Sequence, residues 1–273
     1  MTEVDFVKLS PTQNMTVLVT SRHAVADYPS IATELLSAGH VHAEQVGFVR
    51  PPTSTAAQVR LHMAGDEFCG NATMALAALT SMEQDLDVGR RTGVVLEVSG
   101  LGSLVTCEVE RLEDHFACEL TAPRPISVET YDFAGVETGV MVRYPDAAHL
   151  VVECARHDRT SRDRAEEVAR RLGETEGVSM VGVMLYDPER GELAPLINVP
   201  ALDSMVWERS CGSGTASIGA YLAARAGAPV RASVHQPGGT MHVRANHGPL
   251  GVTELLIGGQ VRIVAEGRAY VHA

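Results

Sequence analysis

Two cysteines have the residue type and the setting for acid–base chemistry. Each is followed by a glycine and a short run of small residues that ends in a threonine: Cys69-Gly70-Asn71-Ala72-Thr73 and Cys211-Gly212-Ser213-Gly214-Thr215. Past the threonines, small or apolar residues continue in both segments. We interpret the pair as an internal repeat that brings one thiol to each side of a substrate.

Each segment is predicted to open a helix, the first over 72–82 and the second ending near Gly227. A helix N-terminus carries unsatisfied N–H groups and partial positive charge, so it binds a carboxylate and is expected to lower the pKa of a cysteine there. Glycine lets the backbone approach the anion, and Asn71 or Ser213 can cap the helix. One thiolate could then remove an α-proton while the other thiol delivers one, which inverts the stereocentre.

The cysteine pair has other interpretations. A disulfide between Cys69 and Cys211 is possible, although a reducing compartment disfavours it. Neither segment has a second Cys or His at zinc-ligand spacing. A thiol–disulfide or metal-binding module therefore stays open as an alternative of a different class. The other three cysteines, in strand patterns, fit small buried hydrophobes: Cys107, Cys118 and Cys154.

Composition narrows the class of protein. A net charge of −12 argues against a nucleic-acid partner, and no apolar run is long enough to span a membrane. The N-terminus lacks the features of a signal peptide, so we expect a cytoplasmic protein. Lys8 is the only lysine and has no phosphate-binding loop beside it, which argues against pyridoxal phosphate. No dinucleotide-binding glycine motif follows a strand, and we expect no cofactor and no metal.

The elements that must position the two cysteines follow the same plan in each half of the chain. Both Cys-Gly helices lack a polar stripe, so each is predicted to be buried within a sheet that wraps around it. The best linker candidate is Ala122-Pro123-Arg124-Pro125. We expect an N-terminal lobe over 1–121, with the last strand, 262–273, as a candidate to complete it, and a C-terminal lobe over 122–261. Further helices are predicted over Ile31–Ala38 and Ser161–Leu172, and strands over 3–8, 15–20, 44–50, 59–64, 94–98, 104–110, 116–121, 139–143, 149–152, 179–186, 194–198, 230–235, 241–245 and 260–265.

Around these residues the sequence resembles the cofactor-independent racemases and epimerases of the diaminopimelate epimerase fold. Within them it is most similar to histidine racemases of staphylopine-type metallophore biosynthesis. The similar segments span both halves of the chain: EQVGF at 44–48, EFCGNATM at 67–74, Trp207-Glu208, SCGSGTASIG at 210–219 and VHQPGG at 234–239.

The resemblance implies an α+β fold of two pseudo-symmetric lobes, each a sheet or barrel around a central helix, with the active site in the cleft. Cys69 and Cys211 would be the acid and base of an isomerase that interconverts L- and D-histidine. The substrate-binding residues implied are Asn14, Glu44, Gln45, Gly70, Asn71, Glu208, Gly212 and Ser213. It also implies a homodimer, with D-histidine supplied to a staphylopine-like opine metallophore.

The substrate side chain is the open part of this interpretation. Diaminopimelate epimerases hold the distal end of their substrate with an Asn in the strand equivalent to Val178–Tyr186, and that strand has none here. A substrate with a charged distal end therefore lacks this known receptor. Diaminopimelate epimerase, or another amino-acid racemase of the same fold, is the alternative to histidine racemase. Glu44 or Glu208 could bind an imidazole. His149 and His235 are weaker candidates that are also explained as structural histidines.

Overall fold

The chain divides into two compact units. The computed structural model describes residues 1–133, 137–200 and 204–272, so residue 273 of the predicted last strand lies outside it. The first unit comprises Met1–Thr121 and Gly258–Ala273, and the second comprises Ala122–Ile257. The fold is mixed α/β, with both parallel and antiparallel strand pairs. None of the helices described is both long and apolar enough to span a membrane.

The first unit is a closed path of strands. In hydrogen-bonding order the strands run from β1 to β7 and then to β16, which pairs back with β1 from Thr2↔Val271 to Pro11↔Val261. The elements are β1 (Thr2–Pro11), β2 (Thr16–Val19), η1 (Val25–Asp27), α1 (Tyr28–Leu36), β3 (Gln45–Arg50), β4 (Val59–Met63), α2 (Gly70–Glu83), β5 (Arg91–Val98), β6 (Val105–Arg111), β7 (Phe116–Thr121) and the later part of β16 (Gly251–Val271).

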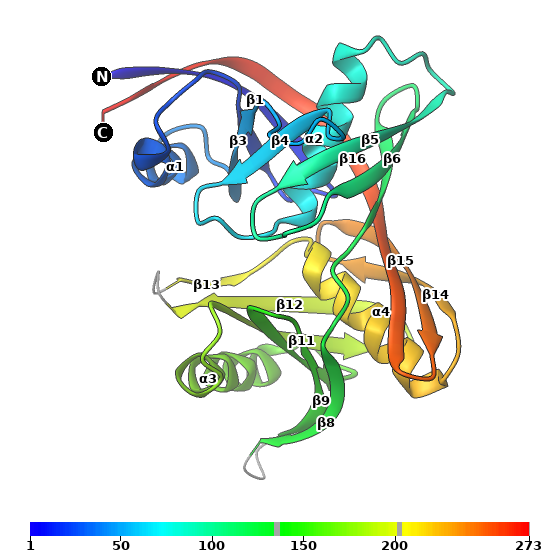
Figure 1. Ribbon diagram of the computed structural model, residues 1–273. Coiled ribbons are helices and arrows are strands. Elements are labelled where there is room, and N and C mark those ends of the chain that lie inside the picture. The colour runs from blue at the N-terminus through cyan, green and yellow to red at the C-terminus, as the bar shows by residue number, and fades with distance from the viewer. Residues whose placement is uncertain (134–136, 201–203, 273) are drawn as a thin grey trace. The chain divides into compact units, whose positions relative to one another are not determined.

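Helix α2 lies inside this path of strands (Figure 1). It contacts every strand from β1 to β7, and its residues from Gly70 to Ser81 are all buried. A helix that is apolar on all sides must find apolar partners on all sides, which the surrounding strands supply. The prediction of a buried helix directly after Cys69 is confirmed.

The second unit has two helices with different surroundings. Its elements are β8 (Ser127–Phe133), β9 (Glu137–Arg143), β10 (Ala147–Glu153), α3 (Arg159–Thr175), β11 (Met180–Asp187), β12 (Glu192–Val199), β13 (Ser204–Trp207), α4 (Gly212–Ala226), β14 (Val230–Gln236), β15 (Gly239–Gly248) and the start of β16. Helix α4 contacts β8–β11, β14 and β15, whereas α3 packs on β11 and β12 (Figure 1). Only one face of α3 is buried, through Ala165, Val168, Ala169 and Leu172.

Several elements differ from the predicted ones. Strands β8 and β13 were not predicted, and β16 extends well beyond the expected 260–265. Helix α1 begins three residues early, at Tyr28, because Pro29 fits the first turn, where its missing N–H has no intrahelical acceptor. Lys8 lies in β1 as predicted, and its Nζ donates to the carbonyl oxygens of Val41 and His42, at 3.0 and 2.9 Å.

Candidate active site

Cys69 is the N-cap residue of α2. Its backbone is extended, with φ −126° and ψ 109°, and its Sγ accepts a hydrogen bond from the N–H of Ala72 at 3.5 Å. The Thr73 hydroxyl donates to the Cys69 carbonyl oxygen at 2.7 Å. The thiol is thus held at the positive end of a buried helix.

Cys211 is the N-cap residue of α4 with the same local geometry. Its φ is −122° and its ψ is 113°, and its Sγ accepts from the N–H of Gly214 at 3.3 Å. The Thr215 hydroxyl donates to the Cys211 carbonyl oxygen, again at 2.7 Å. The internal repeat seen in the sequence is therefore also a repeat of backbone conformation and hydrogen bonding.

Gly214 is required by the space around the second thiol. A Cβ at this position would lie 2.8 Å from Met184 Sδ and 3.3 Å from Cys211 Sγ. A side chain here would press on the sulfur that the Gly214 N–H contacts. Glycine leaves that N–H free to approach the thiol.

The pKa of Cys211 moves opposite to the sequence-based expectation. Burial raises the pKa of this thiol well above its usual range, and the charge and hydrogen bond of the Glu208 carboxylate raise it further. The Ser213 hydroxyl and the Gly214 N–H act in the lowering direction but do not outweigh burial. The expectation considered the helix end and left out desolvation, which favours the neutral thiol.

The residues predicted to bind a carboxylate occupy the first two positions of each helix. Gly70 and Asn71 open α2 and are buried, and Gly212 and Ser213 open α4, with Gly212 buried and Ser213 half-buried. N–H groups in the first turn of a helix have no intrahelical acceptor. Each helix therefore offers backbone donors to an anion beside its cysteine.

Three other predicted residues of the first unit gather around Met15. The Met15 carbonyl oxygen accepts from the N–H groups of Glu44 and Gln45, at 2.7 and 3.1 Å, and the Met15 N–H donates to Glu44 Oε1 at 3.3 Å. Asn14 precedes Met15 and is completely buried. The parallel pairing of β2 with β3 brings these segments together, since Thr16 is the partner of Gln45.

His149 belongs to a buried polar group behind the N-terminal turn of α4. Its Nδ1 lies 2.8 Å from the Ser217 hydroxyl, which lies 3.0 Å from the Tyr144 hydroxyl. Its Nε2 has no hydrogen-bond partner among the described residues, and burial lowers the pKa of His149 to about 4. His235, by contrast, is exposed. Sequence reasoning did not single out Tyr144, which lies in no motif, or Ser217, which lies inside the segment SCGSGTASIG but carries no signal of a contact with His149.

The other three cysteines take no part in either helix cap. All five cysteines are free thiols. Cys107 and Cys118 are buried in β6 and β7, as expected of small hydrophobes, but Cys154 is half-buried and its Sγ donates to the Arg156 carbonyl oxygen at 2.9 Å. Within the described ranges, no three His, Cys, Asp or Glu side chains gather as a metal site requires.

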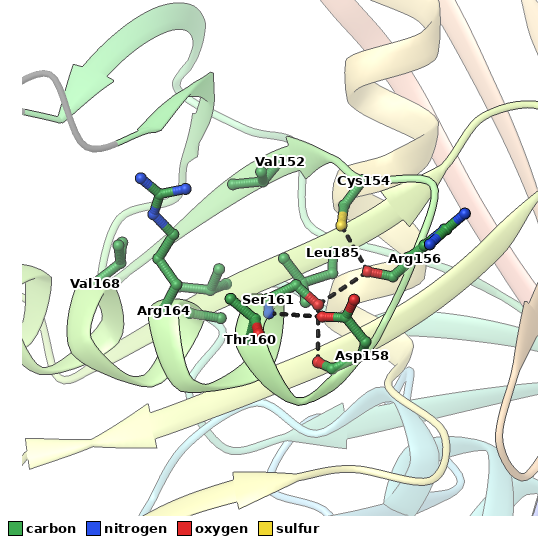
Figure 2. A pocket seen from close by; sticks show the side chains of 11 residues that line it. Val152, Cys154, Arg156, Asp158, Thr160, Ser161, Arg164, Val168 and Leu185 are labelled. Atoms are coloured by element: carbon green, nitrogen blue, oxygen red, sulfur yellow. Dashed lines mark hydrogen bonds between the residues drawn. The ribbon is translucent and has the colours of Figure 1, made fainter.

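A separate cavity of about 390 Å³ lies in the second unit at the start of α3 (Figure 2). Cys154, Arg156 and Arg164 line it, over a floor that includes Val183 and Leu185. Asp158 caps α3 by accepting from the Ser161 N–H at 3.0 Å. None of the predicted site residues lines this cavity.

Comparisons with known proteins place the chain among racemases. The family model described as the histidine racemase CntK N-terminal domain matches residues 3–270. A histidine racemase from Staphylococcus aureus is 33% identical over 275 residues, covering 98% of both chains. One from Fusobacterium nucleatum is 28% identical over 271 residues, covering 98% of this chain and 97% of that one.

Solved structures show the same fold at low sequence identity. A predicted epimerase from Pseudomonas aeruginosa matches with a TM-score of 0.70 at 16% identity, covering 99% of each chain. A hydroxyproline epimerase from Agrobacterium vitis matches with a TM-score of 0.69 at 11% identity, covering 98% of this chain and 92% of that one. The chain thus has an epimerase and racemase fold along its whole length.

Proposed function

Because the chain belongs to the histidine racemase family, we propose that it interconverts L- and D-histidine by moving the α-proton between two cysteine side chains, Cys69 and Cys211. The single observation that supports this mechanism is the repeated N-cap geometry of the two cysteines. Inversion by two bases needs two acid–base groups, one on each face of the α-carbon, each able to take or give a proton. Equivalent thiols at equivalent helix ends meet that need.

The first helical turns supply the second half of the mechanism. Loss of the α-proton leaves a planar anion whose charge spreads onto the carboxylate. Backbone N–H groups of Gly70–Asn71 and Gly212–Ser213, at the positive ends of α2 and α4, are suited to hold that charge. Donors that are already in place need no rearrangement when the charge develops.

The high pKa of Cys211 makes the neutral thiol the resting form of this cysteine. With the thiol neutral, Cys211 is ready to deliver a proton to the α-carbon. For the reverse reaction its proton must leave, and the Glu208 carboxylate that hydrogen-bonds to it is placed to accept that proton. Glu208 is thereby assigned to proton exchange with the Cys211 thiol. Of the two candidate carboxylates, Glu44, beside Asn14 and Gln45, is then the one proposed to bind the imidazole.

Finer features of the proposal rest on the resemblance. We propose a diaminopimelate epimerase-like arrangement in which α2 and α4 are equivalent central helices, supported by the strands that contact each of them. A homodimer, a cytoplasmic location and a role in supplying D-histidine to a metallophore remain predictions. Their tests are the mass in solution, cell fractionation and the products of the neighbouring genes.

The two-cysteine mechanism is tested by replacing each cysteine separately with serine. Wild-type protein incubated with L-histidine in D2O should yield D-histidine that carries deuterium at the α-carbon. Cys69→Ser and Cys211→Ser should each lower racemisation by roughly 10²–10⁴-fold, since each removes one acid–base group. Cys154→Ser, which changes a half-buried thiol outside the site, is the matched control.

Three outcomes would contradict the proposal. Near-full racemisation by either serine variant would exclude a two-base reaction. Exchange of the α-proton of diaminopimelate, but not of histidine, would favour diaminopimelate epimerase. Activity that is lost with a chelator, together with bound zinc, would favour a metal-binding module.

A further inference from the structure

The backbone of Cys211 is held by a side chain from a distant strand. Gln236, the last residue of β14, is buried, and its Oε1 accepts from the Cys211 N–H at 2.8 Å. Its Nε2 donates to the Thr215 hydroxyl at 2.8 Å, and that hydroxyl donates to the Cys211 carbonyl oxygen at 2.7 Å. The three hydrogen bonds close a ring that includes both the N–H and the C=O of the reactive cysteine.

The two backbone groups in this ring each have only one role open to them. The Cys211 N–H can only donate and its carbonyl can only accept. The Gln236 amide must therefore turn its oxygen to the Cys211 N–H and its nitrogen to Thr215. The Thr215 hydroxyl accepts from that nitrogen and donates to the Cys211 carbonyl oxygen. The Thr215 hydroxyl also lies 3.5 Å from Met241 Sδ, a weaker acceptor than the Cys211 carbonyl oxygen at 2.7 Å. The ring therefore favours one backbone conformation at Cys211.

The amino acid at the third helical position explains why this help comes from another strand. In a common helix start, a Glu or Gln at that position reaches back to the N–H of the N-cap residue. Here the third position is Gly214, and a side chain there would press on the Cys211 sulfur. A capping side chain at position 214 would occupy space next to the Cys211 thiol. Gln236 supplies the missing acceptor for the Cys211 N–H from outside the helix.

The residues that follow β14 also hold the chain just before Cys211. The Gly238 N–H, two residues past Gln236, donates to the Arg209 carbonyl oxygen at 2.7 Å. Residues 236–238 thus hydrogen-bond to the chain just before α4 at two residues, Arg209 and Cys211. The direction of the Cys211 side chain follows from the backbone held between them.

We propose that Gln236 is a positioning residue for the racemisation: through the hydrogen-bonded ring with Thr215 it sets the direction of the Cys211 thiol. This inference rests on the proposed two-cysteine function. Gln236 acts through the backbone of Cys211 and is assigned no contact with the substrate. A small misplacement of a reacting group can slow an enzyme by about 10²-fold.

The test compares Gln236→Met with Gln236→Glu. Methionine is similar in size and removes both hydrogen bonds, whereas glutamate keeps an acceptor for the Cys211 N–H and loses the donor to Thr215. We expect Gln236→Met to lower kcat roughly 10- to 100-fold with little change in KM, and Gln236→Glu to lie between it and wild type. Ser233→Ala, an exposed position on the same strand, is the control and should match wild type.

A second readout separates positioning from loss of folding. Under native conditions, iodoacetamide labelling of each cysteine is followed by peptide mass spectrometry. Gln236→Met should change the labelling rate of Cys211 relative to Cys69, with Cys107 and Cys118 staying unlabelled. This ratio needs no racemisation, so it still tests the positioning role if wild type proves inactive on histidine, a result that would contradict only the proposed function.

Three results would overturn the inference. One is a Gln236→Met variant with wild-type kcat. Another is a lower kcat with an unchanged Cys211-to-Cys69 labelling ratio. The last is labelling that rises at Cys107 and Cys118 as well, since this would show that the whole protein has loosened.

Discussion

Acid should destabilise the second unit through His149. This side chain is completely buried, its ring stands edge-on to the Tyr144 ring at 5.7 Å, and its Nε2 has no partner among the described residues. Burial lowers the pKa of His149 from 6.5 to about 4, against a smaller raising effect from the Ser213 backbone. Protonation would place a charge where no described group can accept the Nε2 proton.

The sign and the size of the effect follow from the two pKa values. Between pH 6.5 and 4 the unfolded chain holds a proton on this ring that the folded chain lacks, so stability present above pH 6.5 is lost as the pH falls. At roughly 1.4 kcal/mol per pKa unit, the full effect is about 3 kcal/mol. About 2 kcal/mol of this should be lost by a pH of about 5.

His149→Asn is the perturbation that isolates this effect. Asparagine does not titrate in this range and keeps a polar atom near the position of Nδ1. Urea unfolding is followed by the fluorescence of Trp207, which is the only tryptophan and lies in the same unit as His149. The stability advantage of wild type over the variant should shrink by about 2 kcal/mol between neutral pH and a pH of about 5.

The control is His235→Asn, which replaces an exposed histidine of the same unit. Its unfolding free energy should run parallel to that of wild type across the pH range. If His149→Asn also runs parallel to wild type, the folded protein accommodates a charged His149, and the reasoning from burial is refuted.

Two further predictions concern Cys211. Thr215→Val should lower the free energy of unfolding by about 1–3 kcal/mol, because it leaves the Gln236 amide without its buried acceptor. Thr215→Ser keeps the hydroxyl and should stay close to wild type. A valine variant as stable as wild type in urea would contradict this. Burial, and then the Glu208 carboxylate, raise the pKa of the Cys211 thiol, so Glu208→Gln should let the thiolate form at lower pH and shift the profile of kcat/KM against pH in that direction. An unshifted profile would mean that Glu208 has no influence on the thiol.

The two helices that follow Cys69 and Cys211 could be predicted because their signals are local. Cys-Gly followed by a threonine at the fourth position recurs, and the structure repeats the same cap and the same hydroxyl bond in both helices. The apolar sequence of α2 predicts burial on all sides, which the surrounding strands provide. These conclusions needed only short stretches of sequence around each cysteine.

The parts that could not be predicted depend on distant contacts. Gln236 follows Cys211 by 25 residues, and no periodicity connects a strand end to a helix cap. The pKa of Cys211 depends on burial that only the packed unit reveals. In β16, the adjacent glycines Gly258 and Gly259 suggest a break. A Cβ at Gly258 would lie 2.9 Å from the Cys118 carbonyl oxygen, so glycine there permits close packing within a continuous strand.

The pairing of β1 with β16 has a consequence for synthesis of the chain. β1 pairs with β2 on one edge, but its partner on the other edge is β16, where Thr2 pairs with Val271, so that edge is covered only after nearly all other residues have been made. The second unit is continuous in sequence and needs no residue after Ile257, whereas β1 keeps an open edge until the residues from Gly258 onward are present. In a released chain that ends at Ile257, the second unit should therefore resist proteolysis while the first unit is open to attack.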